Sequence, residues 1–301
     1  MLVTRPVGVI GLGGWCGFLL EALHPDATVF EAAPSLEREP LIELSHRPGA
    51  LIVYHLNVSH SRSLPRHRAR VTSELLSHGA TVWNAAITDI RKRSIQARLD
   101  QAGLPTTRAT KEDAVSTPVI VKTNANYGGL PEARLAGLLS LEPRPLPEAM
   151  ARADALPDYP VLERHLVPDD WWERDDLAIE RYVANAQDSF FRVYVVGNRC
   201  VYSQGWTPGP VKKMAPGIAR CNWMGELHER CQGVSVELTS LISQGARTLN
   251  LDFGTLDVVF DESSFYIVDV NTTPFWGRES QSGLLDHLRA AVGSPESRAP
   301  R

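Results

Sequence analysis

The stretch from Leu251 to Gly277 constrains the fold of this 301-residue chain more than any other part of it. Two runs, LDVVF and FYIVDV, are rich in apolar and β-branched residues, and the polar residues 261–264 separate them. This pattern predicts two antiparallel strands joined by a hairpin turn. Pairing across the turn would bring Asp257 close to Asp269. Asn271 would project from the same face as Asp269, because alternate residues of a strand share a face.

The polar side chains of this hairpin have the chemistry of a magnesium site. Mg²⁺ prefers hard oxygen ligands, commonly one or two carboxylates with water and nucleotide phosphates. A carboxylate inside an apolar strand also has to be paired or bound to be tolerated. The alternative is a buried pair of strands with two acids at its edge. The hypothesis that we carry forward is metal ligation by Asp257, Asp269 and Asn271, with Mg²⁺ as the expected ion and Mn²⁺ as a second option.

The N-terminal residues 1–83 alternate between strand-like and helix-like runs, which predicts a small parallel α/β unit. The strands are VGVIG, ATVFEA, ALIVYHL and TVWNA, and helices are expected from Trp15 to Leu23 and from about Leu64 to Ser77. The glycine loop Gly11–Gly17 fails the dinucleotide pattern, since the third glycine of G-x-G-x-x-G would fall at Cys16. We expect a tight strand–helix turn that supports or faces a substrate and binds no NAD(H) or FAD.

Lys122 lies near the end of a strand, residues 119–123, which follows a helix expected over residues 89–103. The loop after this strand contains Gly128 and Gly129. Glycines allow backbone N–H groups to approach phosphate oxygens, and a lysine adds a point charge. The lysine precedes the glycines, unlike in the phosphate loop G-x-x-x-x-G-K-[ST]. Taken alone, Lys122 is therefore explained equally well by a phosphate contact and by an exposed charge at the end of a strand.

Three further strand-like runs follow, at residues 178–183, 190–197 and 199–206. The backbone at the end of the first could bond the edge of an adenine. Arg192 interrupts the second, and an arginine in so apolar a strand meets an anion, either a phosphate or a carboxylate in a structural ion pair. A polar loop is expected from Thr207 to Gly225, followed by a helix over residues 234–249. Residues 131–158 show no strong period.

The order of these motifs, ending in D…D-x-N-x-x-P, resembles the ATP-grasp superfamily, especially its glutathione synthetase-like and ribosomal-protein glutamate ligase-like branch. The resemblance covers residues 84–277. It implies an α/β protein with the ATP-grasp fold. Residues 1–83 would be the pre-ATP-grasp subdomain, and residues 84–290 the ATP-grasp domain, divided near residue 182. A flexible tail, residues 291–301, would follow.

The resemblance also implies roles for residues at matching positions. Lys92 and Lys122 look like the lysines that contact the ATP phosphates, beside the loop with Gly128 and Gly129. The residues that look like the adenine hinge include Glu180, Tyr182 and Val183, and Asp188 falls near the family's ribose-binding acid. Arg192 and Arg220 look like the arginines that hold the γ-phosphate and the acyl phosphate. Asn222 follows Arg220 at the spacing of the R-x-N pair in related ligases and is expected to be catalytic with them. The magnesium ligands would again be Asp257, Asp269 and Asn271. One departure concerns Asp269, since the family's second metal ligand is usually glutamate.

The activity that the resemblance implies is ATP-dependent joining of a carboxylate to an amine through an acyl phosphate, with release of ADP and phosphate. The substrates would be small, amino-acid-like or peptide-like molecules. One alternative is a kinase that phosphorylates a hydroxyl, and another is a nucleotide-binding module without turnover. The second alternative is disfavoured because both lysines, Arg192 and the metal ligands are all present.

Composition bounds the remaining possibilities. The formal net charge is −4, so no general basic field indicates nucleic acid. The four cysteines lack metal-binding spacing and are expected to be free thiols. The sequence has no uninterrupted apolar run of about 18 residues, so no membrane span is expected. We expect a soluble cytoplasmic protein, and a homodimer is compatible with the sequence.

Overall fold

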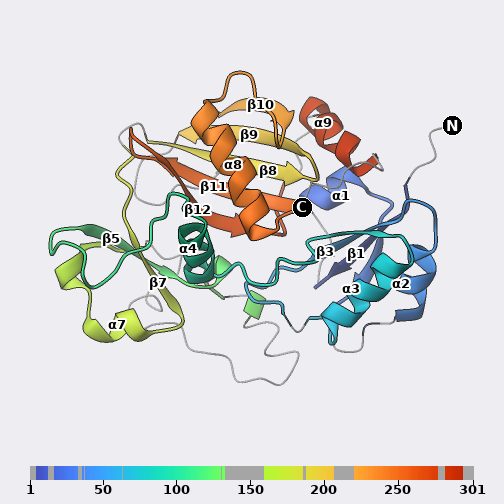
Figure 1. Ribbon diagram of the computed structural model, residues 1–301, viewed down its shortest axis with the longest axis horizontal. Coiled ribbons are helices and arrows are strands. Elements are labelled where there is room, and N and C mark those ends of the chain that lie inside the picture. Colours follow the sequence, from blue (N-terminus) through green and yellow to red (C-terminus); the bar gives the residue numbers. More distant parts are fainter. Residues whose placement is uncertain are drawn as a thin grey trace.

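The computed structural model describes residues 5–12, 17–32, 36, 38–62, 64–129, 131–132, 159–185, 188–206, 220–276 and 282–293. In this part of the chain helices pack against three β-sheets, of four, three and five strands (Figure 1). The architecture is the mixed α/β arrangement that the sequence predicts. No helix among these residues is long and apolar enough to cross a membrane.

The N-terminal sheet is parallel, with the strand order β2-β1-β3-β4. Its strands are β1 (Val7–Gly11), β2 (Thr28–Glu31), β3 (Leu51–His55) and β4 (Thr81–Trp83). Helices α2 (Arg38–Ser45) and α3 (Arg68–Ser77) cover one face, and α1 (Leu19–Leu23) packs on the other. The inner strands β1 and β3 are therefore buried on both faces, which explains their continuous apolar runs, whereas the edge strand β2 is largely exposed. The second helix begins at Arg68 and not near Leu64, and Trp15 lies outside the described residues.

The central part contains a small antiparallel sheet with the order β6-β5-β7. Its elements are α4 (Lys92–Gln101), β5 (Pro118–Thr123), the 3₁₀ turn η1 (Asn126–Gly129), β6 (Val161–Glu163), the 3₁₀ turn η2 (Arg164–Leu166), α7 (Asp169–Glu173) and β7 (Leu177–Arg181). Helix α4 does not cover this sheet. It packs against the next, larger sheet, and so connects the two parts.

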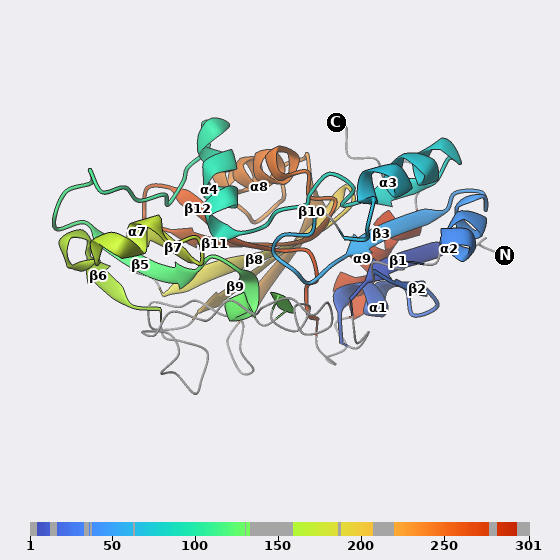
Figure 2. The ribbon, with the colours of Figure 1, turned by 90° about the horizontal axis from the view of Figure 1, so that it is seen from below.

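The largest sheet is antiparallel, with the order β10-β9-β8-β11-β12. Its elements are β8 (Ser189–Val196), β9 (Arg199–Trp206), β10 (Arg220–Glu226), α8 (Val236–Leu249), β11 (Phe253–Phe260), β12 (Phe265–Asn271) and α9 (Ser282–Gly293). Helices α8 and α4 cover one face of the sheet (Figure 2). Helices α9 and α1 cover only the end of the other face that is nearest the N-terminal sheet.

Two segments differ from the sequence expectations. Residues 220–226 are not part of a loop but form the edge strand β10, paired with β9 along its whole length. The segment RCNWMGE mixes polar and apolar residues with a glycine, so its composition does not distinguish a half-exposed edge strand from a loop. Helix α9 was not expected, and it continues to Gly293, inside the segment assigned to a tail. Residues 207–219 lie outside the described part.

Candidate active site

One row of polar residues runs across all five strands of the large sheet. Strand pairing aligns Asn222 with Ser203, Ser203 with Arg192, Arg192 with Asp257, and Asp257 with Asp269. Directly paired residues project from the same face of a sheet, so all five side chains lie on one face. Two residues along, Tyr194 and Val201 already belong to the apolar cluster beneath α9. The polar row therefore borders the part of this face that helix α9 covers.

The expected proximity of Asp257 and Asp269 is confirmed, because the two residues are direct cross-strand partners. The register shifts immediately after this pair, where Val258 pairs with Ile267 and Val268 is the extra residue of a bulge. Asn271 lies two residues beyond Asp269, opposite Thr255. Its side-chain oxygen accepts hydrogen bonds from the backbone N–H and the hydroxyl of Thr273, at 2.8 and 3.1 Å.

Arg192 and Asp257 form a two-pronged ion pair at the centre of the row. The Nε and Nη2 atoms of Arg192 each lie 2.8 Å from one carboxylate oxygen of Asp257. Burial acts to lower the pKa of the guanidinium, but the Asp257 carboxylate raises it overall above the ordinary value. Of the two anions considered for Arg192, a carboxylate is thus the one that it contacts here.

Asp269 is partly buried, with 36% of its side chain accessible. Lys92 Nζ is 3.8 Å from its Oδ1 atom, and the backbone N–H of Val270 donates to the same oxygen at 3.1 Å. Burial and the neighbouring Asp257 raise the pKa of this carboxyl, although Lys92 and Lys122 oppose the shift. The positive charge nearby therefore does not fully compensate this carboxylate.

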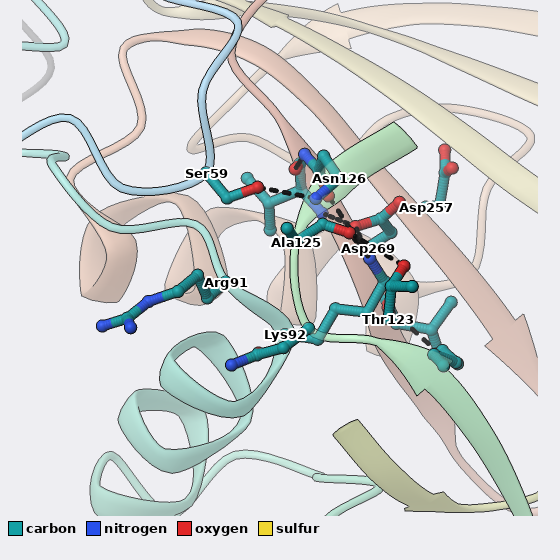
Figure 3. Close-up of polar contacts among 12 residues, drawn as sticks. Ser59, Arg91, Lys92, Thr123, Ala125, Asn126, Asp257 and Asp269 are labelled. Atoms are coloured by element: carbon teal, nitrogen blue, oxygen red, sulfur yellow. Dashed lines mark hydrogen bonds and ion pairs between the residues drawn. The ribbon is translucent and has the colours of Figure 1, made fainter. Parts of the chain in front are cut away.

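Two buried lysines reach the free edge of β12 from the central part. Lys92 begins α4, and its Nζ donates to Ala125 O at 3.3 Å and to Asn126 Oδ1 at 3.4 Å. Lys122 Nζ lies 2.7 Å from Glu180 Oε2 and 3.5 Å from the carbonyl oxygen of Val268 in the bulge. Figure 3 shows Lys92 and Asn126 beside Asp269. The structure thus brings both expected lysines to the acidic end of the row.

The donor set fits a divalent cation. Asp257 and Asp269 offer carboxylate oxygens from paired positions, Asn271 offers a side-chain carbonyl, and the raised pKa of Asp269 is the shift that an added positive charge would offset. Among the described residues no group of three His, Cys, Asp or Glu side chains could hold a metal ion. A metal ion here would therefore need Asn271 and oxygens from a substrate or water in addition to the two carboxylates.

The residues expected to contact adenine and ribose differ in how many of their hydrogen-bonding groups are already used within the protein. Glu180 is 2% exposed; its Oε2 accepts from Lys122 and Thr107, and its Oε1 has no hydrogen-bond partner among the described residues. The backbone N–H of Tyr182 donates to Pro118 O, so this donor is already used within the sheet. Val183 follows β7, and Asp188 stands before β8 with a positive φ of 49°.

The remaining expected residues fall at the borders of the site. Gly128 and Gly129 lie in η1 with φ values of 64° and 81°, a backbone conformation that favours glycine. Asn222 is exposed at the sheet edge, two strands from Arg192. Arg220 belongs to the same edge strand. Neither residue lies in the loop that the sequence suggested.

Sequence reasoning missed several residues that build the site. Ser203 completes the row, and its position could be found only from the strand order. Asn126 was part of the loop after Lys122, but it had no assigned role; its Nδ2 donates to Val270 O at 2.9 Å. Gln96 donates to Ile267 O at 2.8 Å. Together with Lys122, these residues bind three backbone carbonyls of β12.

The glycine loop ends beside the segment that follows β12. The backbone N–H of Leu19 donates to Pro274 O, the N–H of Trp276 donates to Gly17 O, and Phe18 forms an antiparallel bridge with Phe275. Gly17 has a φ of 75°, and a Cβ atom there would lie 2.4 Å from the Phe275 ring. This glycine is thus needed for a close approach to Phe275. Residues 13–16 of the loop lie outside the described part.

Comparison with solved structures identifies this arrangement of elements. The ATP-grasp ligase PsnB, complexed with precursor peptide PsnA2 and AMPPNP, matches 96% of this chain and 98% of its own, with 15% identity and a TM-score of 0.51. The chain adopts the ATP-grasp fold. PsnB complexed with a phosphomimetic variant of its minimal precursor, Mg and ADP matches 95% of this chain and 98% of its own, with 15% identity and a TM-score of 0.50. No protein-family model and no curated protein sequence matches the chain.

Proposed function

We propose that this ATP-grasp protein is an ATP-dependent ligase that joins a carboxylate to an amine and forms an amide bond. The observation that supports the proposal most strongly is the acidic end of the polar row, where Lys92 and Lys122 meet Asp257 and Asp269 beside Arg192. Transfer of a phosphoryl group requires positioning and neutralisation of negative charge more than covalent help from the protein. Cations and metal-binding carboxylates on one face of a sheet supply both.

In this proposal Lys92 and Lys122 bind the phosphates of ATP. Each ammonium group has three donors. Lys122 donates to the Glu180 carboxylate and to one neutral acceptor. Lys92 donates to two neutral acceptors, and its one charged partner, Asp269, lies 3.8 Å away. Mg²⁺ held by Asp257, Asp269 and Asn271 would neutralise charge on the transferring phosphoryl group. The unpartnered Oε1 of Glu180 suits a hydrogen-bond donor such as an adenine amine. Tyr182, Val183 and Asp188 would border the nucleoside.

The reaction proceeds in two displacements. An oxygen of the substrate carboxylate attacks the γ-phosphorus, the bond to the β-phosphate oxygen breaks, and an acyl phosphate and ADP form. The amine then attacks the acyl carbon and the phosphate leaves. Arg192 lies at the centre of the row, where its guanidinium can hold the acyl phosphate and stabilise the oxyanion of the tetrahedral species. Arg220 and Asn222 on the neighbouring edge strand would extend this anion site.

The substrate class is a small carboxylate with an amino-acid-like or peptide-like amine. PsnB, which shares the fold, was solved with a precursor peptide. Peptides with acidic residues are therefore the first substrates to test, followed by free amino acids and dipeptides.

The decisive experiment measures ADP release from ATP and Mg²⁺ in the presence of each candidate acid and amine, with mass spectrometry of the product. Hydroxylamine in place of the amine should trap a hydroxamate. Asp257→Asn should abolish turnover. Asp261→Asn, on the exposed turn of the same hairpin, is the matched control and should retain turnover. A stable phosphate ester on a hydroxyl, formed without any amine, would contradict the proposal and indicate a kinase.

A further inference from the structure

Phe275 is an exposed aromatic side chain in a segment that is otherwise buried. Thr272, Thr273 and Pro274 are buried, and Trp276 is half-buried, yet Phe275 is 56% exposed. Removing an aromatic ring from water is worth a few kcal/mol, so leaving one exposed forgoes about that much stabilisation. An exposed aromatic ring on a rigid segment is therefore a candidate contact for a ligand.

The backbone around Phe275 is fixed on both sides. Asn271 Oδ1 accepts from Thr273, and the Thr272 hydroxyl donates to Leu56 O in the N-terminal part. The Trp276 ring packs edge-on against Tyr194 with 4.9 Å between ring centroids. With the Pro274 and Trp276 backbone bonds to the Gly17–Leu19 segment, these contacts hold the backbone on both sides of Phe275, whose side chain stays more than half exposed.

Phe275 lies four residues beyond Asn271, the last of the proposed metal ligands, at the point where the N-terminal part meets β12. Phe18 packs edge-on to it, with 6.5 Å between ring centroids, and Phe18 in turn contacts the His55 ring at 5.0 Å. Burial lowers the pKa of His55 to about 3, so this imidazole is uncharged at neutral pH. The aromatic pair thus rests on an uncharged base, four residues along the chain from the proposed metal ligand Asn271.

We propose that Phe275 and Phe18 form a side-chain subsite that selects substrates with an aromatic or large aliphatic side chain next to the reacting group. This inference rests on the proposed ligase function and names the substrate class of the same site. The charged row would hold the reacting carboxylate and phosphate, and the aromatic pair would hold the adjacent apolar side chain. Gly17 would keep the Phe275 ring in position, since any larger residue there would displace it.

The test compares wild type with Phe275→Ala on a panel of Ala-Xaa dipeptides, in which Xaa is Phe, Leu, Ser, Glu or Lys. Leu166→Ala is the matched control, because Leu166 is 58% exposed and lies in η2, away from the row. One methylene more or less of a substrate in an apolar site changes kcat/KM by about 10- to 200-fold, and removing the Phe275 ring removes at least that much contact. We expect Phe275→Ala to lower kcat/KM for Ala-Phe and Ala-Leu at least about tenfold, mainly through KM, and Leu166→Ala to leave it unchanged.

A second variant and a second measurement keep the outcome independent of turnover. Gly17→Ala should reduce the same preference by displacing the ring. Saturation-transfer NMR with Ala-Phe and Ala-Glu, in the presence of ADP and Mg²⁺, measures binding alone. Binding of Ala-Phe that Phe275→Ala weakens supports the subsite even if no dipeptide releases ADP, a result that would overturn only the ligase function. Equal selectivity of wild type and Phe275→Ala in both assays overturns the subsite and leaves the ligase proposal standing.

Discussion

The buried ion pair between Lys122 and Glu180 allows a quantitative test of the site. Nζ and Oε2 are 2.7 Å apart, and both side chains are buried. At an effective dielectric constant of about 20, the attraction at this distance is about 6 kcal/mol. Desolvation costs several kcal/mol for each ion, so the pair as a whole contributes little net stability. Removing one partner, however, leaves the other charge buried and uncompensated.

We therefore expect Lys122→Met and Glu180→Leu each to lower the free energy of unfolding by about 3–5 kcal/mol. Glu180→Leu should cost about 1 kcal/mol more, because the Thr107 hydroxyl loses its acceptor. The double variant removes both charges and should cost only about 1–2 kcal/mol. The coupling energy between the two positions should then exceed about 3 kcal/mol.

The assay is urea unfolding followed by the fluorescence of the seven tryptophans. The exposed pair of Lys111 and Glu173, with 3.3 Å between Nζ and Oε1, is the matched control. Its single variants should each change the unfolding free energy by less than about 1 kcal/mol. Additive effects at Lys122 and Glu180, with a double variant as unstable as the singles combined, would refute the reasoning.

Three further expectations concern the metal, the contact between β3 and β11, and the hairpin. Asp257→Asn should lower ADP release at least about 100-fold while the protein stays folded, because a bound metal ion contributes several kcal/mol to charge stabilisation; wild-type activity that persists in EDTA would contradict the metal. Asn84→Ala should lower the unfolding free energy by about 2–4 kcal/mol, since its buried side chain bonds the backbone of both β3 and β11; a loss below about 0.5 kcal/mol in urea unfolding would argue against this. Gly254→Ala should cost about 1–3 kcal/mol and weaken binding of an ATP analogue, because its Cβ would lie 2.5 Å from the carbonyl oxygen of Asn271. Gly283→Ala meets no atom within 4 Å and serves as its control in calorimetry.

The hairpin with Asp257 and Asp269 was predictable because its information is local. Two β-rich runs and a polar turn fix the approximate register, and the register decides which acids meet. The N-terminal sheet was predictable for a related reason. Parallel strands covered on both faces have continuous apolar sequences, and these stand out from the helices between them.

The partners of Arg192 were not predictable from the sequence. Strand β8 pairs with β11 across a separation of 65 residues between Arg192 and Asp257, and no local pattern reveals that the two strands are neighbours. Strand β10 was not predictable either, because the mixed composition of residues 220–226 suits a half-exposed edge strand and a loop equally. Ser203 entered the site only through the same strand order.

The free edge of β12 explains why fold and site are difficult to separate in this protein. An edge strand exposes unpaired carbonyl groups, and such edges have to be covered. Here three side chains donate hydrogen bonds to backbone carbonyls of β12. Gln96 bonds Ile267 O, Lys122 bonds Val268 O, and Asn126 bonds Val270 O. Lys122 is therefore both a candidate phosphate ligand and part of the contact that holds the three-stranded sheet against the large sheet. A loss of activity in Lys122→Ala would not distinguish the two roles. Lys122→Arg retains the charge but not the compact geometry, so unchanged stability with weaker binding of an ATP analogue would assign the lysine to the phosphate.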